Sequence, residues 1–210
     1  MTALYQLIRI FIHVPAGIIA FTLHGYARAA ASLALGDKYP ANQGRLTLNP
    51  LRHIEPVGFL CFLFFRLGWS KPVETRPFAY TKDRRKSELI VAVLPLAVNL
   101  LAAAVFAVIA HVMLAGVPGD VMNARGGHRL IFDLVAAGAY YNLCFVLFNL
   151  IPVSPLDGAR FIAIVKPGWW VKLLNRERMA QTILLILLFF NILGGFIGYF
   201  AGGILRFIYI

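Results

Sequence analysis

Long apolar runs are the feature that most constrains this chain, because each is long enough to cross a lipid bilayer. A helix needs about 20 consecutive apolar residues to span the hydrocarbon core. Four runs reach this length, over residues 4–35, 89–115, 130–152 and 180–205. Hydrophobic residues make up 60% of the 210 residues, against about 45–50% in soluble domains. We therefore expect an all-α polytopic membrane protein, one integral-membrane domain over 1–210 with about four long transmembrane helices.

A fifth apolar run, VGFLCFLFFRLGW at 57–69, is short and carries Arg66 near its end. It leaves too little length to cross, so we expect a re-entrant or interfacial segment. The first run lacks a basic start and a small-residue cleavage site, so we interpret it as an uncleaved span rather than a signal peptide.

Basic residues predict the orientation of the chain in the membrane. Lys and Arg total 20 against 9 Asp and Glu, and they gather in 36–88 and 153–178. The positive-inside rule places both segments in the cytoplasm. This requires an even number of crossings between them, and 89–115 and 130–152 supply two. The whole of 36–88 then lies on one side of the membrane only if 57–69 does not cross. Both termini are then external. The basic excess indicates contact with anionic lipid, and we find no nucleic-acid-binding motif.

The cytoplasmic segment 36–88 is predicted to contain a hairpin, the re-entrant segment and a basic loop. Alternation in QGRLTLNP (43–50) predicts a short strand that stops at Asn49-Pro50. GWSKPV (68–73) is similar to an edge strand at the membrane surface, and TKDRRKSE (81–88) to a solvated basic loop. Both cysteines, Cys61 and Cys144, lie in apolar runs and read as small core residues.

Several polar residues lie inside the apolar runs, where each ionisable group is costly unless it has a partner or a function. His24 and Arg28 are four residues apart and share a helix face. Asp157 follows the Pro-rich end of the third long run, while Asn142 and Asn149 share a face of that run. Asn99 lies in the second long run. Structural roles remain open for all of them, since Arg28 can extend to the headgroups, Asp157 can cap a helix and Asn can join helices.

Four blocks of the sequence carry a resemblance to a known family. They are HGYARAAASLALGD (24–37), QGRLTLNPLRHIEPVG (43–58), GWSKPV (68–73) and NLCFVLFNLIPVSPLDGARF (142–161). Together they resemble the site-2 protease family of intramembrane zinc metalloproteases, in its compact bacterial branch without PDZ or CBS domains. The resemblance implies a bacterial plasma-membrane protein. It also implies a zinc site in which an H-E-x-x-H helix supplies two ligands and a general base, and an L-D-G turn supplies the third ligand.

The resemblance maps the first histidine onto His24 and the aspartate onto Asp157, but the other two positions differ. The general-base position is Gly25, which has no side chain, and the second histidine is Arg28, which cannot donate a lone pair to a metal. We hypothesise that an Arg28–Asp157 ion pair occupies the place of the metal, so zinc binding is doubtful. The retained blocks make six residues candidates for a substrate pocket: Arg45, Thr47, Asn49, Asn99, Asn142 and Asn149.

Three functions remain open on this sequence. The first is a membrane protein that binds transmembrane or membrane-adjacent protein segments without ordinary proteolysis, with edge pairing by the 44–50 strand. The second is an active metalloprotease with a rearranged site, completed by His53 with Glu55 as base. The third is a structural subunit of a membrane complex. The loss of the base and of one ligand favours a protein that lacks ordinary proteolysis.

Overall fold

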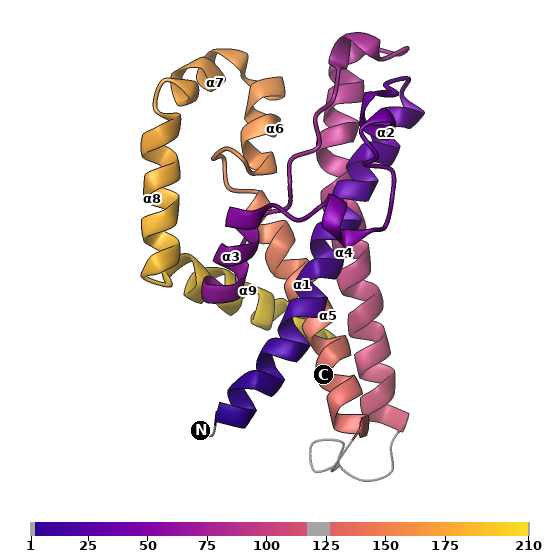
Figure 1. The fold of residues 1–210 in the computed structure, drawn as a ribbon, viewed down its shortest axis with the longest axis vertical. Helices are drawn as coiled ribbons and strands as arrows, with labels where there is room; N and C mark the ends of the chain where they lie inside the picture. Colours follow the sequence, from indigo (N-terminus) through magenta and orange to yellow (C-terminus); the bar gives the residue numbers. More distant parts are fainter. Residues whose placement is uncertain (1–2, 117–126, 210) are drawn as a thin grey trace.

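Three long helices form the centre of the fold. The computed structural model describes residues 3–116 and 127–209, and these are helical segments joined by loops. Helices α1 (Ala3–Ala34), α4 (Arg84–Gly116) and α5 (Gly127–Asn149) pack against one another in pairs (Figure 1). Small residues such as Ala20, Ala107 and Ala139 are at most 1% exposed. They let the helix backbones approach closely, as is common where helices pack within a membrane.

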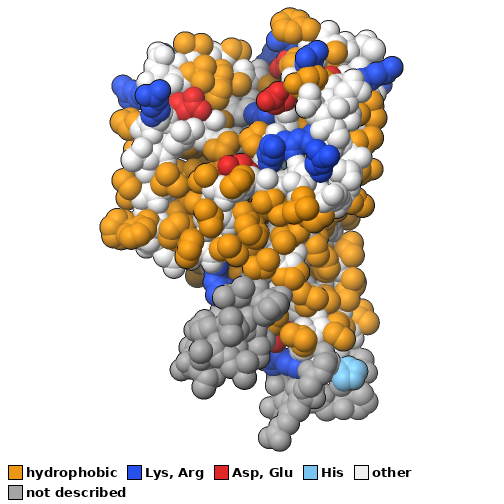
Figure 2. Space-filling view, in the orientation of Figure 1, with side chains coloured by type: hydrophobic (Ala, Val, Ile, Leu, Met, Phe, Trp, Pro, Cys, Tyr) orange, Lys and Arg blue, Asp and Glu red, His pale blue; other side chains and the backbone are white. Residues whose placement is uncertain are grey.

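The helices that could cross a membrane number two or three in the described part of the chain, rather than the four expected. Helices α4 and α5 are long and apolar enough by themselves. The predicted first run forms one continuous helix, α1, whose side chains before Ile12 are not described, so its crossing stays a prediction. The broad hydrophobic surface in Figure 2 lies below the region where most of the visible Lys and Arg side chains gather.

The fourth apolar run is bent, which corrects the expectation of a single helix over 180–205. It forms α8 (Glu177–Phe189) and α9 (Ile192–Tyr209), which meet at an angle of 70°. Asn191 lies at the break with φ of 56°, a left-handed conformation that Asn tolerates better than most residues. The pair provides a third span only if both helices count as one broken crossing.

The expected strand at 44–50 is not found, and no other strand is formed by the residues that the structure describes. Instead, Ile54 and Ser70 pair in an isolated antiparallel β-bridge. Asn49 accepts a hydrogen bond from the Leu51 N–H and starts a short 3₁₀ helix, η1 (Pro50–Arg52). This local cap and the missing N–H of Pro50 end any extended pairing before a ladder can form.

The fifth run forms a helix too short to cross a bilayer. Helix α3 (Pro56–Phe65) has ten residues and ends at Arg66, whose φ is 61°. The chain then folds back against α3. The two backbones lie so close that a Cβ added at Gly68 would be 2.0 Å from the Gly58 carbonyl oxygen. A helix followed by a returning chain agrees with the prediction that 57–69 does not cross.

The two basic segments lie at the same end of the helix bundle (Figure 1). The first includes α2 (Tyr39–Asn42) and η2 (Pro77–Ala79), and the second includes α6 (Asp157–Val165) and α7 (Pro167–Leu174). The buried Asp37 carboxylate secures the end of α1 by accepting hydrogen bonds from Ser32 Oγ at 2.8 Å and the Arg76 N–H at 2.7 Å. Asp157, the first residue of α6, lies in the second of these segments.

Candidate functional site

A buried polar cluster joins four helices. It consists of His24 and Arg28 from α1, Asn99 from α4, Asn142 from α5 and Asp157 from the first turn of α6. Each of these residues is at most 4% exposed. Residues far apart in the sequence therefore converge on one point, and they include Arg28 and Asp157, the two side chains predicted to pair.

The carboxylate of Asp157 is held by both α1 side chains. Arg28 Nη2 lies 2.5 Å from Asp157 Oδ1, and His24 Nε2 lies 2.9 Å from Oδ2. The predicted ion pair is therefore present. Arg28 Nε also donates to the Val91 carbonyl at 3.4 Å, which fixes the guanidinium against α4. Burial raises the pKa of Asp157, but the charges of Arg28 and His24 outweigh this effect and hold it below its ordinary value.

The two asparagines determine which nitrogen of His24 carries a hydrogen. Asn142 Nδ2 donates to the Gly138 carbonyl at 2.9 Å, so its oxygen faces Asn99 Nδ2 at 3.0 Å. Asn99 Nδ2 also donates to the Ala20 carbonyl at 3.0 Å, so Asn99 Oδ1 faces His24 Nδ1 at 3.2 Å. Since this oxygen can only accept, Nδ1 bears the hydrogen. Nε2, the other ring nitrogen, then lies 3.3 Å from Arg28 Nη2 and 2.9 Å from Asp157 Oδ2.

A second guanidinium lies close to the cluster and was not predicted as part of it. Arg160, one turn along α6 from Asp157, donates from Nη2 to the Val73 carbonyl at 3.1 Å. The pKa of Arg160 is lowered to about 10, first by burial and then by the nearby charge of Arg28, although the charge of Asp157 opposes this shift. Two guanidinium groups thus share the neighbourhood of one carboxylate, which is unfavourable for a divalent cation.

The imidazole of His53 fills the space beside Gly25. A Cβ added at Gly25 would lie 2.2 Å from His53 Nδ1. His53 is fully buried, and its Nε2 donates to the Thr47 carbonyl at 2.7 Å. Burial lowers the pKa of His53, so Nδ1 carries a bare lone pair. A side chain at the family's general-base position would therefore collide with this ring.

The other predicted pocket residues lie outside the buried cluster. Asn149 is buried, but its Nδ2 donates to the Phe145 carbonyl of its own helix at 2.9 Å. Thr47 and Asn49 lie on the loop before η1, where Thr47 Oγ1 accepts from the Asn49 N–H at 3.2 Å. Arg45 contributes to a separate surface pocket. None of these three loop residues contacts His24 or Asp157 through a hydrogen bond or ion pair that the described structure contains.

The residues at the cluster do not fit a zinc ion. A catalytic zinc site needs three protein ligands and one open position. His24 and Asp157 offer two donors, but the third family position holds the Arg28 guanidinium, which has no lone pair. Within 3–116 and 127–209, no group of three His, Cys, Asp or Glu residues is placed to hold a metal. His53 and Glu55 therefore do not complete a rearranged site in this arrangement; Glu55 instead accepts from the Gly58 N–H at the start of α3.

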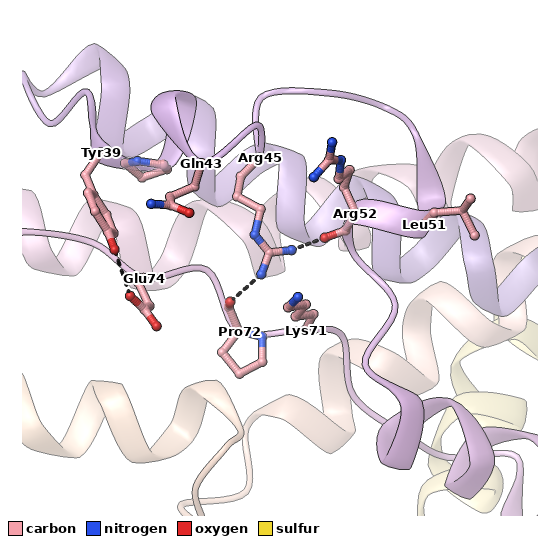
Figure 3. A pocket seen from close by; sticks show the side chains of 9 residues that line it. Tyr39, Gln43, Arg45, Leu51, Arg52, Lys71, Pro72 and Glu74 are labelled. Carbon is pink, nitrogen blue, oxygen red and sulfur yellow. Dashed lines mark hydrogen bonds between the residues drawn. The ribbon is translucent and has the colours of Figure 1, made fainter.

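An open surface pocket lies beside the η1 loop (Figure 3). Its walls include Arg45, Arg52, Lys71 and Glu74. Of these, only Arg45 was predicted as a pocket residue. The excess of basic residues in 36–88 was visible in the sequence, but their convergence depends on how the loops fold.

Fold and cluster together define a helical membrane protein with a buried polar site between α1, α4, α5 and α6. Comparison with curated proteins finds a relative in Bacillus subtilis (strain 168), named "Putative zinc metalloprotease YwhC". The two are 32% identical over 187 residues, which cover 86% of this chain and 80% of the relative. The chain belongs to the site-2 protease family of intramembrane zinc metalloproteases. No protein-family model matches the chain, and no solved structure matches it significantly.

Proposed function

We propose that this protein binds transmembrane protein segments without cleaving them. The observation that carries this proposal is the Arg28–Asp157 ion pair at 2.5 Å, in a family whose chemistry places a metal at that position. Metal-assisted peptide hydrolysis needs a bound metal to activate water and a base to accept its proton. Here a guanidinium takes one ligand position and Gly25 offers no carboxylate.

A hollow beside the cluster supports a binding role. It has a volume of about 350 Å³ and lies between α4 and α6, with Leu96, Phe161 and Asp157 among the residues that line it. Its lining is predominantly apolar, which suits a helix that arrives from the lipid. Edge pairing by residues 44–50 is not retained in the proposal, because that segment forms no strand.

Photocrosslinking tests the binding proposal. A photoreactive residue at Phe161, which lines the hollow, should capture membrane proteins through their apolar helices, and those proteins should stay intact. The same residue at Tyr199, which is 79% exposed on α9, is the control and should not capture the same proteins. Equal capture from both positions, or cleaved partners that become intact when Asp157 is replaced by Ala, would reject the proposal.

We further propose that segments 36–88 and 153–178 face the cytoplasm. Their basic residues follow the positive-inside rule. Their position at one end of the bundle is consistent with a shared side of the membrane.

A further inference from the structure

The surface pocket beside η1 is a candidate ligand site that is independent of the proposed function. Its volume is about 550 Å³, within the range of about 300–1,000 Å³ that is usual for small-molecule sites. It lies between α2, η1 and the extended residues 71–74, and Figure 3 shows the Arg45 guanidinium between these walls. The buried cluster around His24 and Asp157 does not contribute to its lining.

The charges in this pocket are unbalanced. Arg45, Arg52 and Lys71 supply three positive charges against the single carboxylate of Glu74, an excess of two. Arg52 and Lys71 are exposed, and neither forms a salt bridge with the described residues. Glu74 lies on the far side of Arg45 from Arg52, where Tyr39 donates to it at 3.2 Å (Figure 3). The Glu74 carboxylate therefore already has a hydrogen-bond partner, while Arg52 and Lys71 have no salt-bridge partner among the described residues.

Arg45 is a fixed cation in the lining of the pocket. The residue is only 9% exposed, and its guanidinium donates to the carbonyls of Arg52 and Pro72. Burial lowers the pKa of Arg45; the charge of Glu74 raises it and that of Arg52 lowers it. An anion in the pocket would offset both the loss of water around Arg45 and its repulsion from Arg52.

We propose that this pocket binds a phosphomonoester, carried by a lipid headgroup or by a small soluble molecule. A phosphomonoester has a charge of about −1.5 to −2 near pH 7, which matches the excess of two. Guanidinium and ammonium groups are the usual protein partners of phosphate oxygens. Leu51 lines the same pocket and is 78% exposed, so an apolar side chain is available to an acyl chain.

Binding to the purified full-length protein in neutral detergent tests the proposal. Glycerol 3-phosphate probes the soluble source by calorimetry. Phosphatidic acid in mixed micelles probes the lipid source in the same instrument, with phosphatidylglycerol as a phosphodiester control. We expect saturable binding of at least one phosphomonoester and weaker binding of phosphatidylglycerol. Preference for phosphatidic acid over glycerol 3-phosphate identifies the lipid source, and the reverse identifies a soluble ligand.

Two charge variants decide whether the pocket is responsible. The double substitution Arg52→Gln/Lys71→Gln should weaken binding by about tenfold or more, because it removes two charge-assisted contacts. The matched control Lys82→Gln/Arg85→Gln removes two exposed charges outside the pocket and should bind as the unaltered protein does. Equal losses in both variants would show general charge attraction and overturn the proposal, as would equal binding of phosphatidylglycerol or no binding of either phosphomonoester.

Discussion

The ion pair between Arg28 and Asp157 is nearly inaccessible to solvent, with side chains 5% and 3% exposed. A buried pair is weak evidence of net stability, but removal of one partner leaves the other charge uncompensated. We expect Arg28→Met to lower the free energy of unfolding by about 3–5 kcal/mol. Thermal unfolding in detergent should show a clear loss.

The paired substitution Arg28→Met/Asp157→Asn is the control for this prediction. It removes both charges, so its loss of stability should be much smaller than the sum of the two single losses. Additive losses would contradict a direct ion pair.

A second residue-scale prediction concerns the contact of Gly25 with His53. Gly25→Ala would place a methyl group 2.2 Å from His53 Nδ1. The imidazole must move, and overpacking of this kind usually lowers the free energy of unfolding by about 1–3 kcal/mol. A melting-temperature comparison measures the effect. His53→Ala should relieve it in the double variant, whereas an unchanged effect of Gly25→Ala in the His53→Ala background would refute the contact.

The sequence predicted some of these residue contacts and not others. The Arg28–Asp157 pair could be predicted, because the family resemblance maps both residues onto ligand positions of one metal site, where a buried charge needs a partner. The packing of His53 on Gly25 could not, since it depends on the path of the loop that leads from α2 into η1. Arg160 was counted only as a cytoplasmic cation, because its burial follows from how α6 folds back onto residues near Val73.

At the scale of elements, helices with long apolar patterns were predicted well, while breaks within them were missed. The run 180–205 contains no proline and no charged residue. Its hydropathy therefore predicts one continuous span and does not indicate the 70° bend at Asn191. The predicted strand at 44–50 failed for a related reason. Its alternation matched a strand, but Asn49 and Pro50 favour a local turn, and no neighbouring segment among the described residues pairs with 44–50 to stabilise an extended conformation.

The bend can be tested through Asn191, whose φ is 56°. Asn191→Ala should lower the free energy of unfolding by about 1–2 kcal/mol, because a Cβ without a polar side chain disfavours the left-handed region. Asn191→Gly is the matched control and should be neutral or mildly stabilising, since glycine adopts this conformation readily. If thermal unfolding shows that Asn191→Ala is more stable than Asn191→Gly, residue 191 does not have the left-handed conformation described here.

For the whole molecule, the arrangement of basic segments predicts which parts are accessible from each side of the membrane. Single cysteines replacing Lys86 and Lys172 should react with a membrane-impermeant thiol reagent only from the cytoplasm. A cysteine replacing His128, exposed at the opposite end of α5, should react only from outside. The native Cys61 and Cys144 are buried and should give little background. Labelling of positions 86 and 172 from opposite sides would contradict the proposed topology.

The zinc content of the purified, unaltered protein tests the central claim most directly. If the Arg28 guanidinium occupies the place of a metal ligand beside Asp157, elemental analysis after purification without chelators should find far less than one zinc per chain. One zinc per chain, lost when Asp157 is replaced by Ala, would contradict the account.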